Sequence, residues 1–257
     1  GLAEGLDHLV LVEAQPPVSF FGYEGRRSCV APEACAFHIL AREEEDGTAA
    51  LEAAAGELGA QPFTAEPRAA PAPPEDGPLD ADGIGRVMAA LLPAGAVISE
   101  EAVSCGAAIC PHLDLAAPHE HLPVTGGAIG QCLPVALGAA IACPGRKVVA
   151  VEADGSGLYT MQALWTMARE RLDVVTVILA NRRYRILDVE MRRTGAATVG
   201  PRANDMIDIG RPCLDWVKLS EGMGVPATRA ATAAGFAAQF GEAMSRPGPR
   251  LIEAVID

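Results

Sequence analysis

The sequence predicts an α/β protein in which helices flank a parallel β-sheet. The chain has 257 residues, of which 50% are hydrophobic and 4% aromatic. This composition is typical of a globular protein and excludes a disordered chain, a collagen or a coiled-coil rod. Short continuous runs of valine, isoleucine and leucine alternate with segments of helical spacing. Strands that are apolar on both faces are typical of a parallel sheet covered by helices on both sides.

This alternating pattern begins after residue 78, so residues 79–257 are predicted to form one domain. Strands are expected where apolar residues are continuous, and helices where they recur every three or four positions. The expected strands are 96–99, 147–152, 173–180 and 251–256, and the expected helices are 80–92, 130–142 and 159–171. In the last of these helices we expect Met161 and Trp165 to face the core.

The first 60 residues carry a shorter pattern. A buried strand is expected over 7–14, a second apolar element over 33–40 and a helix over 48–58. Because this pattern starts with a strand almost at once, we interpret residues 1–60 as the tail of a domain whose beginning lies elsewhere. Residues 61–78 are rich in proline, alanine and acidic side chains, which predicts a linker.

Charge, hydropathy and cysteine usage exclude several classes of protein. The 20 basic and 33 acidic residues give a formal net charge of -13, which argues against a nucleic-acid partner. No apolar stretch is long enough to span a membrane, and the N-terminal residues lack the basic start of a secretory signal. The 7 cysteines show no metal-type spacing, so we expect reduced thiols in a cytoplasmic protein.

Two oxygen-bearing side chains follow successive strands of the predicted sheet. Asp154 ends the first strand, and Asn181 ends the next strand, one crossover unit later. Carboxyl ends of neighbouring parallel strands share one ligand crevice, and such oxygens suit Mg²⁺ held together with phosphates. Gly155 and Ser156 follow at a helix start, where N–H groups can bind phosphate. These residues predict a magnesium-diphosphate site, although Asp-Gly-Ser alone is more often an ordinary capped turn.

Five segments carry motifs that occur together in one enzyme family. They are residues 17–23, 93–101, 125–131 (Thr-Gly-Gly-Ala-Ile-Gly-Gln), 153–156 (Ala-Asp-Gly-Ser) and 180–181 (Ala-Asn). The last two are similar to a GDGS motif followed at a fixed interval by NN, and the third to a GGAIG cofactor loop. In this order the segments resemble thiamine-diphosphate enzymes of the acetolactate synthase large-subunit and benzoylformate decarboxylase group.

This resemblance implies a fold and an activity. Residues 79–257 would form the diphosphate-binding domain with the thiamine-diphosphate-binding fold. Residues 1–60 would be the tail of a Rossmann-like central domain. The implied cofactors are thiamine diphosphate and Mg²⁺, and the implied reaction is decarboxylation of a 2-oxo acid followed by carboligation. Whether FAD also binds is left open.

The resemblance also implies the residues that bind the metal and the diphosphate. Mg²⁺ would be held by the side chains of Asp154 and Asn181 and by the backbone carbonyl of Arg183. The diphosphate would lie against Gly155, Ser156 and Ser104.

Four further residues are implied to contact the rest of the cofactor. The carbonyl of Gly127 would accept a hydrogen bond from the cofactor's amino group. Ile129 would be the apolar wedge that bends the cofactor, and it is the residue closest to a catalytic role. Tyr184 and Ile186 would line the cofactor cleft.

Two positions depart from the family signature. Ala153 replaces the first glycine of GDGS, and Ala180 replaces the first asparagine of NN. Because alanine is small and neither position is an expected side-chain ligand, we expect the metal site to survive both changes.

One family element has no counterpart in this sequence. In the family, a glutamate on a separate N-terminal domain activates the cofactor's pyrimidine ring. Glu100, Glu101 and Glu152 belong by their motifs to the diphosphate side. The chain is therefore expected to supply half of an active site and to need a pyrimidine-binding domain, from a companion chain or from the front of a longer protein. The resemblance further implies a homo- or hetero-oligomer.

Two other classes of function stay open. The absent glutamate and the two alanines would also fit a non-catalytic or regulatory subunit. A nucleotide-binding Rossmann protein would need G-x-G-x-x-G after its first strand, and that loop is absent from the sequence. His119 and His121 could face a substrate, but an exposed polar loop is expected there. Cys105 and Cys110 are not expected to form a disulfide or to bind a metal.

Overall fold

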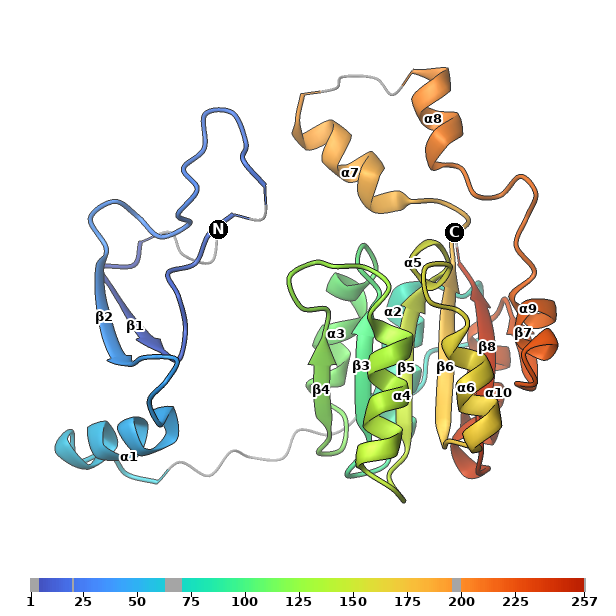
Figure 1. The fold of residues 1–257 in the computed structure, drawn as a ribbon, viewed down its shortest axis with the longest axis horizontal. Coiled ribbons are helices and arrows are strands. Elements are labelled where there is room, and N and C mark those ends of the chain that lie inside the picture. Colours follow the sequence, from blue (N-terminus) through green and yellow to red (C-terminus); the bar gives the residue numbers. More distant parts are fainter. Residues whose placement is uncertain (1–4, 20, 63–70, 196–199, 257) are drawn as a thin grey trace. The chain divides into compact units, whose positions relative to one another are not determined.

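The chain folds into two compact units, Gly1–Pro67 and Arg68–Asp257. The structure is a computed structural model that describes residues 5–19, 21–62, 71–195 and 200–256 (Figure 1). Part of the predicted linker, residues 63–70, lies outside the described residues.

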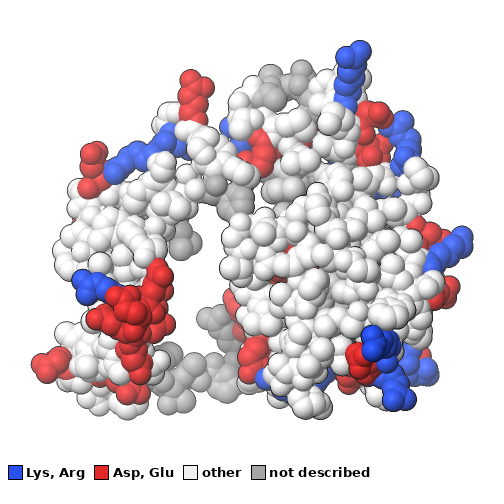
Figure 2. All heavy atoms as spheres, viewed as in Figure 1, with Lys and Arg blue, Asp and Glu red and all other residues white. Residues whose placement is uncertain are grey.

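The first unit is a two-stranded parallel sheet with one helix. Strand β1 (His8–Val12) pairs with β2 (Ala36–Ala41), and helix α1 (Gly47–Glu57) follows. The helix begins after Asp46, whose carboxylate accepts the backbone N–H of Ala49 at 2.9 Å. The run 42–46 before it is exposed, as expected of a solvated loop, and Figure 2 shows acidic side chains gathered there.

The second unit is built on a parallel sheet of six strands, which confirms the predicted fold class. The order across the sheet is β4 (Glu120–Pro123), β3 (Val97–Glu101), β5 (Val148–Ala153), β6 (Val174–Ala180), β8 (Arg250–Val255) and β7 (Ala227–Ala230). Every pairing is parallel. All carboxyl ends therefore lie at one edge of the sheet, the edge that carries helix α5 (Asp154–Gly157) in Figure 1.

Helices cover both faces of this sheet. One face packs against α2 (Ala81–Leu91), α3 (Gly106–Leu113) and α10 (Ala233–Ser245). The other face packs against α4 (Cys132–Ala142), α6 (Ala163–Glu170) and α9 (Trp216–Gly222). Each fully buried Leu, Ile, Val or Phe stabilises the fold by about 1.5–3 kcal/mol, so these two layers hold the strand ends in fixed positions.

Two more helices continue from the carboxyl edge of the sheet. Helix α7 (Arg185–Arg193) follows β6, and helix α8 (Pro201–Ile207) follows α7 (Figure 1). The backbone N–H of Tyr184, before α7, donates to the carbonyl of Ile207 at 2.9 Å. This bond joins the start of α7 to the end of α8.

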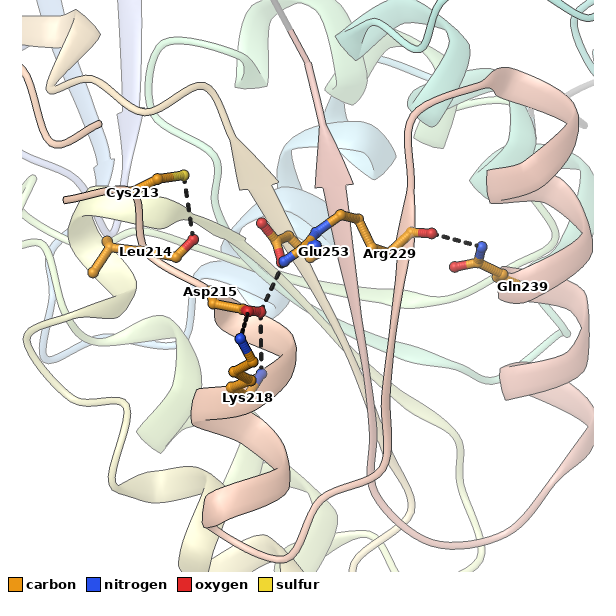
Figure 3. A network of polar contacts seen from close by, with 7 residues as sticks. All are labelled: Cys213, Leu214, Asp215, Lys218, Arg229, Gln239 and Glu253. Atoms are coloured by element: carbon orange, nitrogen blue, oxygen red, sulfur yellow. Dashed lines mark hydrogen bonds and ion pairs between the residues drawn. The ribbon is translucent and has the colours of Figure 1, made fainter. Parts of the chain in front are cut away.

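A single arginine links the far edge of the sheet to two helices. The guanidinium of Arg229 on β7 contacts Glu253 on β8 at 2.9 Å and Asp215, before α9, at 2.8 Å. Its backbone carbonyl accepts a hydrogen bond from Gln239 on α10 at 3.0 Å. Figure 3 shows this network, in which Asp215 also contacts Lys218. The short edge strand β7 is thereby fixed through both the guanidinium and the backbone carbonyl of Arg229.

The expectation that Trp165 faces the core is wrong. The helix predicted over 159–171 begins only at Ala163, and its buried side includes Leu164 and Met167. Trp165 is consequently 54% exposed, with the guanidinium of Arg169 over its ring. Met161 lies in the turn before the helix and packs, partly buried, against the core.

The expected loop around the histidines is also wrong in part. Residues 120–123 form strand β4, which pairs with β3 at the edge of the sheet. Edge strands are short and exposed, so a polar stretch such as Glu-His-Leu-Pro gives no apolar signal.

Among the described residues, no helix is long and apolar enough to cross a membrane.

Candidate active site

A small pocket opens at the carboxyl edge of the sheet, over the ends of β5 and β6. Most of the residues singled out from the sequence line it, namely Ser104, Ile129, Gly155, Ser156, Asn181, Arg183, Tyr184 and Ile186. Asp154 is buried below the lining, and Gly127 lies outside it. Val103, Ala153 and Arg185 complete the pocket.

Asp154 joins the two strand ends. Ala153, the residue before Asp154, pairs with Leu179 across β5 and β6. This pairing brings together the residues that follow the two strands. The Oδ2 atom of Asp154 accepts the backbone N–H of Arg182 at 2.6 Å, so the carboxylate reaches the peptide directly after Asn181. The side chains predicted to share a metal thus lie at one place.

The other oxygen of Asp154 lacks a partner. Asp154 is 2% exposed, and its Oδ1 atom has no hydrogen bond within the part of the chain that the structure describes. Burial raises the pKa of this carboxyl to about 6, although the N–H of Arg182 acts in the opposite direction. A buried oxygen without a donor is costly, and a divalent cation would supply the missing partner.

The turn after β6 presents further oxygen atoms. Arg182 adopts a left-handed conformation with φ of +57°, and the Oδ1 atom of Asn181 accepts the N–H of Arg183 at 3.0 Å. The carbonyl of Arg183 accepts the N–H of Arg185 at 2.8 Å, which leaves its second lone pair for another ligand.

The charged end of Arg183 points elsewhere. Its guanidinium donates to the Oδ1 atom of Asn204 on α8 at 2.6 Å and lies 3.9 Å from Asp188 on α7. An arginine beside a cation site is therefore compatible with a cation, because its charge is held by these two helices.

Gly155 is required by the packing of Tyr184. A Cβ atom at Gly155 would lie 2.6 Å from the Tyr184 ring, which is closer than real side chains approach. The absence of a side chain lets the ring cover the start of α5. The two residues therefore form one wall of the pocket together.

The hydroxyl of Ser156 is engaged with a buried acid. It donates to the Oε1 atom of Glu152, and Glu152 is fully buried on β5. Burial raises the pKa of Glu152 to about 8, and the negative charge of Glu101 adds to this effect. In this arrangement the backbone of Ser156, rather than its hydroxyl, is what remains for a ligand.

A buried carboxylate positions the loop that carries Ile129. Glu101, at the end of β3, accepts backbone N–H groups of Gly130, Gln131 and Cys132 at 2.5, 2.8 and 2.8 Å. These bonds fix the start of α4 and hold Ile129, which is 36% exposed, at the pocket.

Sequence reasoning missed three contributors to this site. Glu101 was assigned to the diphosphate side, but a position at the end of a strand did not reveal which backbone groups it binds. Val103 lines the pocket from a left-handed conformation with φ of +46°, which valine rarely adopts and no pattern signals. Arg185 directly follows Tyr184 and could have been named from that position alone. Gly127, by contrast, has a positive φ of 62° as its loop requires.

The sequence and the fold match one enzyme family. Residues 104–254 match the model of the C-terminal TPP binding domain of thiamine pyrophosphate enzymes, so the chain belongs to this family. The expected resemblance is thereby confirmed.

Two individual proteins show which members of this family the chain is similar to. The chain is 45% identical over 258 residues to a Mycobacterium tuberculosis protein named "Putative acetolactate synthase large subunit IlvX", a match over 98% of this chain and 49% of that protein. It is 32% identical over 191 residues to benzoylformate decarboxylase of Pseudomonas aeruginosa, covering 73% of this chain and 35% of that enzyme.

A solved structure agrees with these relatives. The thiamine diphosphate-dependent 4-hydroxybenzoylformate decarboxylase of Rhodococcus jostii RHA1 superposes with a TM-score of 0.78 at 25% identity, covering all of this chain and 50% of that one. The chain thus spans about half the length, or less, of the proteins it matches.

Proposed function

We propose that this chain is the cofactor-binding half of a thiamine-diphosphate- and Mg²⁺-dependent enzyme that decarboxylates 2-oxo acids and joins the product to an acceptor, as in acetolactate synthase. Family membership supports the cofactor. The observation that supports a bound metal ion is the buried, unpartnered Oδ1 atom of Asp154 at the junction of two strands.

The residues present fit a magnesium ion. The side chains of Asp154 and Asn181 and the carbonyl of Arg183 offer three oxygen atoms from two adjoining strand ends. Mg²⁺ prefers such hard oxygen ligands and usually completes its shell with phosphate oxygens and water. Asn181 would exchange its bond to the Arg183 N–H for the ion, or accept both, since an amide oxygen has two lone pairs.

The pocket lining also supports contacts with two parts of the cofactor. Gly155 and the backbone of Ser156 offer a surface without side chains beside the proposed metal. Ile129, held at the pocket by the Glu101 bonds to its neighbours, offers an apolar contact above it. When bound, thiamine diphosphate supplies an electron sink for decarboxylation. This chain's own contribution is to bind and orient it.

The second half of the active site is proposed to come from a pyrimidine-binding domain. The matched relatives are about twice as long as this chain, which supports a further domain in the working enzyme. The acids Glu101 and Glu152 are bonded to the α4 start and to Ser156, so neither is placed to act as the activating glutamate. We propose an oligomer in which that domain faces the pocket described above.

The metal and cofactor assignment can be tested by thermal unfolding. At a ligand concentration 100 times its dissociation constant, Mg²⁺ with thiamine diphosphate should raise the melting temperature by roughly 5–10 °C. Asp154→Asn should abolish this rise, because it removes the charged ligand. The matched control Asp7→Asn lies in the first unit and should keep it. A wild-type chain whose melting temperature does not respond, alone or with the pyrimidine-binding domain, would rule the assignment out.

Catalysis needs its own measurement. When the chain is combined with its pyrimidine-binding domain, CO₂ release from pyruvate should be detected. Cofactor binding without any release of CO₂ from pyruvate or benzoylformate would instead support the non-catalytic or regulatory subunit.

A further inference from the structure

Three metal-ligating side chains from separate elements meet at the edge of the sheet. They are Glu100 at the end of β3, Cys110 on α3 and His121 on β4. Their ligand atoms, one from each residue, all lie within 4.8 Å of one another. Because the three residues come from different elements, their spacing in the sequence gives no metal motif. The expectation that Cys110 takes part in no metal site rested on that spacing.

The local packing brings these groups together. Helix α3 approaches Glu100 closely at Gly106, where a Cβ atom would lie 3.1 Å from the Oε1 atom of Glu100. Glu100 is 6% exposed, and Oε1 accepts the N–H of Ala102 at 2.6 Å, a bond that leaves the second carboxylate oxygen unused. Among the described residues, Glu100 forms no ion pair with a basic side chain, and a buried carboxylate of this kind beside a thiol favours a cation.

His121 is available as a ligand. Among the described residues its ring makes no hydrogen bond, and its ring neighbour is His119 at 6.5 Å. His119 itself is turned to the carbonyl of Ala117 at 2.9 Å. One of two adjacent histidines is thus bonded to backbone, and the other faces the thiol and the carboxylate.

We propose that Glu100, Cys110 and His121 form a Zn²⁺ site with a fourth position for water. Thiolate and imidazole select zinc over Mg²⁺, which takes oxygen ligands. With Zn–S of about 2.3 Å and Zn–N of about 2.0 Å, tetrahedral ligand atoms lie roughly 3.5 Å apart. The ligand atoms lie within 4.8 Å of one another, so binding requires them to approach by roughly 1 Å. The two anionic ligands neutralise the ion's charge.

The thiol of Cys110 has to lose its proton to bind zinc. Burial raises the pKa of Cys110, and the nearby charge of Glu100 raises it further. A bound dication reverses both effects because it stabilises the thiolate, so zinc uptake releases a proton.

The position of this site gives it a role. Strand β4 runs directly into loop 125–131, and Glu100 adjoins Glu101, which holds the end of that loop. A zinc ion would bind β4, β3 and α3 to one another next to the loop that carries Ile129. The proposed zinc site therefore holds the cofactor loop, residues 125–131, in position. Its ligand set differs from that of the proposed Mg²⁺ site.

Metal analysis of the full chain tests the proposal. After removal of metals with a chelator, the wild-type chain should take up one Zn²⁺, and Co²⁺ should give a thiolate-to-metal absorption band. Cys110→Ser and His121→Gln should each weaken binding at least tenfold. Cys213→Ser removes an exposed thiol away from the cluster and is the matched control that should bind normally. Asp154→Asn should also bind normally, because it alters the other metal site.

Two results would overturn the proposal. One is Zn²⁺ uptake by the Cys110→Ser variant with the affinity of the wild-type chain. The other is a folded wild-type chain whose Co²⁺ spectrum lacks a thiolate band. The cobalt spectrum decides even if Cys110→Ser fails to fold.

Discussion

At the scale of single residues, the candidate site depends on what glycine permits. Gly155 and Gly157 stand in the same short helix, and each lies against a large ring, Tyr184 and Trp216 respectively. The ring of Trp216 is fully buried, whereas that of Tyr184 lines the pocket. The Asp-Gly-Ser-Gly sequence is therefore needed for packing as well as for ligand approach.

We predict that Gly155→Ala destabilises the chain by about 1–3 kcal/mol, the usual cost of overpacking. The added methyl group would meet the Tyr184 ring, and the ring would have to move into the pocket. Denaturant unfolding measures the cost, and cofactor titration measures the loss of binding.

Gly138→Ala is the matched control. It lies in helix α4 with open space around it, so it should stabilise by about 0.5–1 kcal/mol. Tyr184→Ala should restore stability to the Gly155→Ala variant. If Gly155→Ala were as stable as Gly138→Ala, the Tyr184 ring would not constrain position 155.

At the scale of elements, two carboxylates determine how loops and edge strands are held. Glu101 is buried and binds three successive backbone N–H groups. Asp215 is partly exposed and joins α9 to the edge strand β7 (Figure 3). Substitution of Glu101 is expected to change stability and hydrogen exchange. Substitution of Asp215 is expected to change how stability depends on pH.

Glu101→Ala should cost about 3 kcal/mol or more, because hydrogen bonds to a buried charge contribute about 1.5–3 kcal/mol each. Hydrogen exchange should become faster at Gly130, Gln131 and Cys132, whose N–H groups lose their acceptor. Glu57→Ala, at the end of α1 in the first unit, is the control. Unchanged protection at the three amides would contradict the role of Glu101 in holding the loop.

Asp215→Asn should lower stability at neutral pH and have little effect in acid. A hydrogen bond from the Lys218 side chain, and then its backbone and Arg229, lower the pKa of Asp215 below its ordinary value of 3.8. A lowered carboxyl pKa stabilises the folded state above the unfolded pKa, and this contribution disappears as pH falls through the folded one. Urea unfolding at pH 7 and at pH 3 should show the difference shrinking; a constant difference would disprove the linkage.

The sequence predicted elements in proportion to their burial. The central strands β5 and β6 are continuous apolar runs and were located to within a residue or two. The edge strands β4 and β7 were missed because each has only four residues, all exposed in β4 and two exposed in β7, which leave no periodic signal. Likewise, Trp165 was misplaced because the start of α6 after a turn changes which side faces inward.

The candidate site shows the same limit. Most of its lining residues lie within or directly beside the family motifs, each of which is a short contiguous segment. The engagement of Ser156 with Glu152, and of Glu101 with the α4 start, required three-dimensional contacts between distant segments. A motif specifies which residues are present, but it does not specify which of their atoms already have partners.

At the scale of the whole molecule, the second unit contains all the groups on which both proposals depend. Both hydrophobic clusters and all candidate ligands lie within residues 71–257. We predict that this segment alone melts in one transition and keeps the affinity of the full chain for Mg²⁺ and thiamine diphosphate. Calorimetry and cofactor titration on the two proteins check this. A tenfold weaker affinity of the segment would show that the first unit contributes to the site.

The strand order has a consequence for biosynthesis. Among the described strands, β8 is synthesised last, yet it lies between β6 and β7. Until β8 has emerged from the ribosome, β6 presents an unpaired edge and β7 has no neighbouring strand. The sheet can therefore close only after residues 250–255 have been synthesised, and an exposed edge of this kind is what chaperones protect.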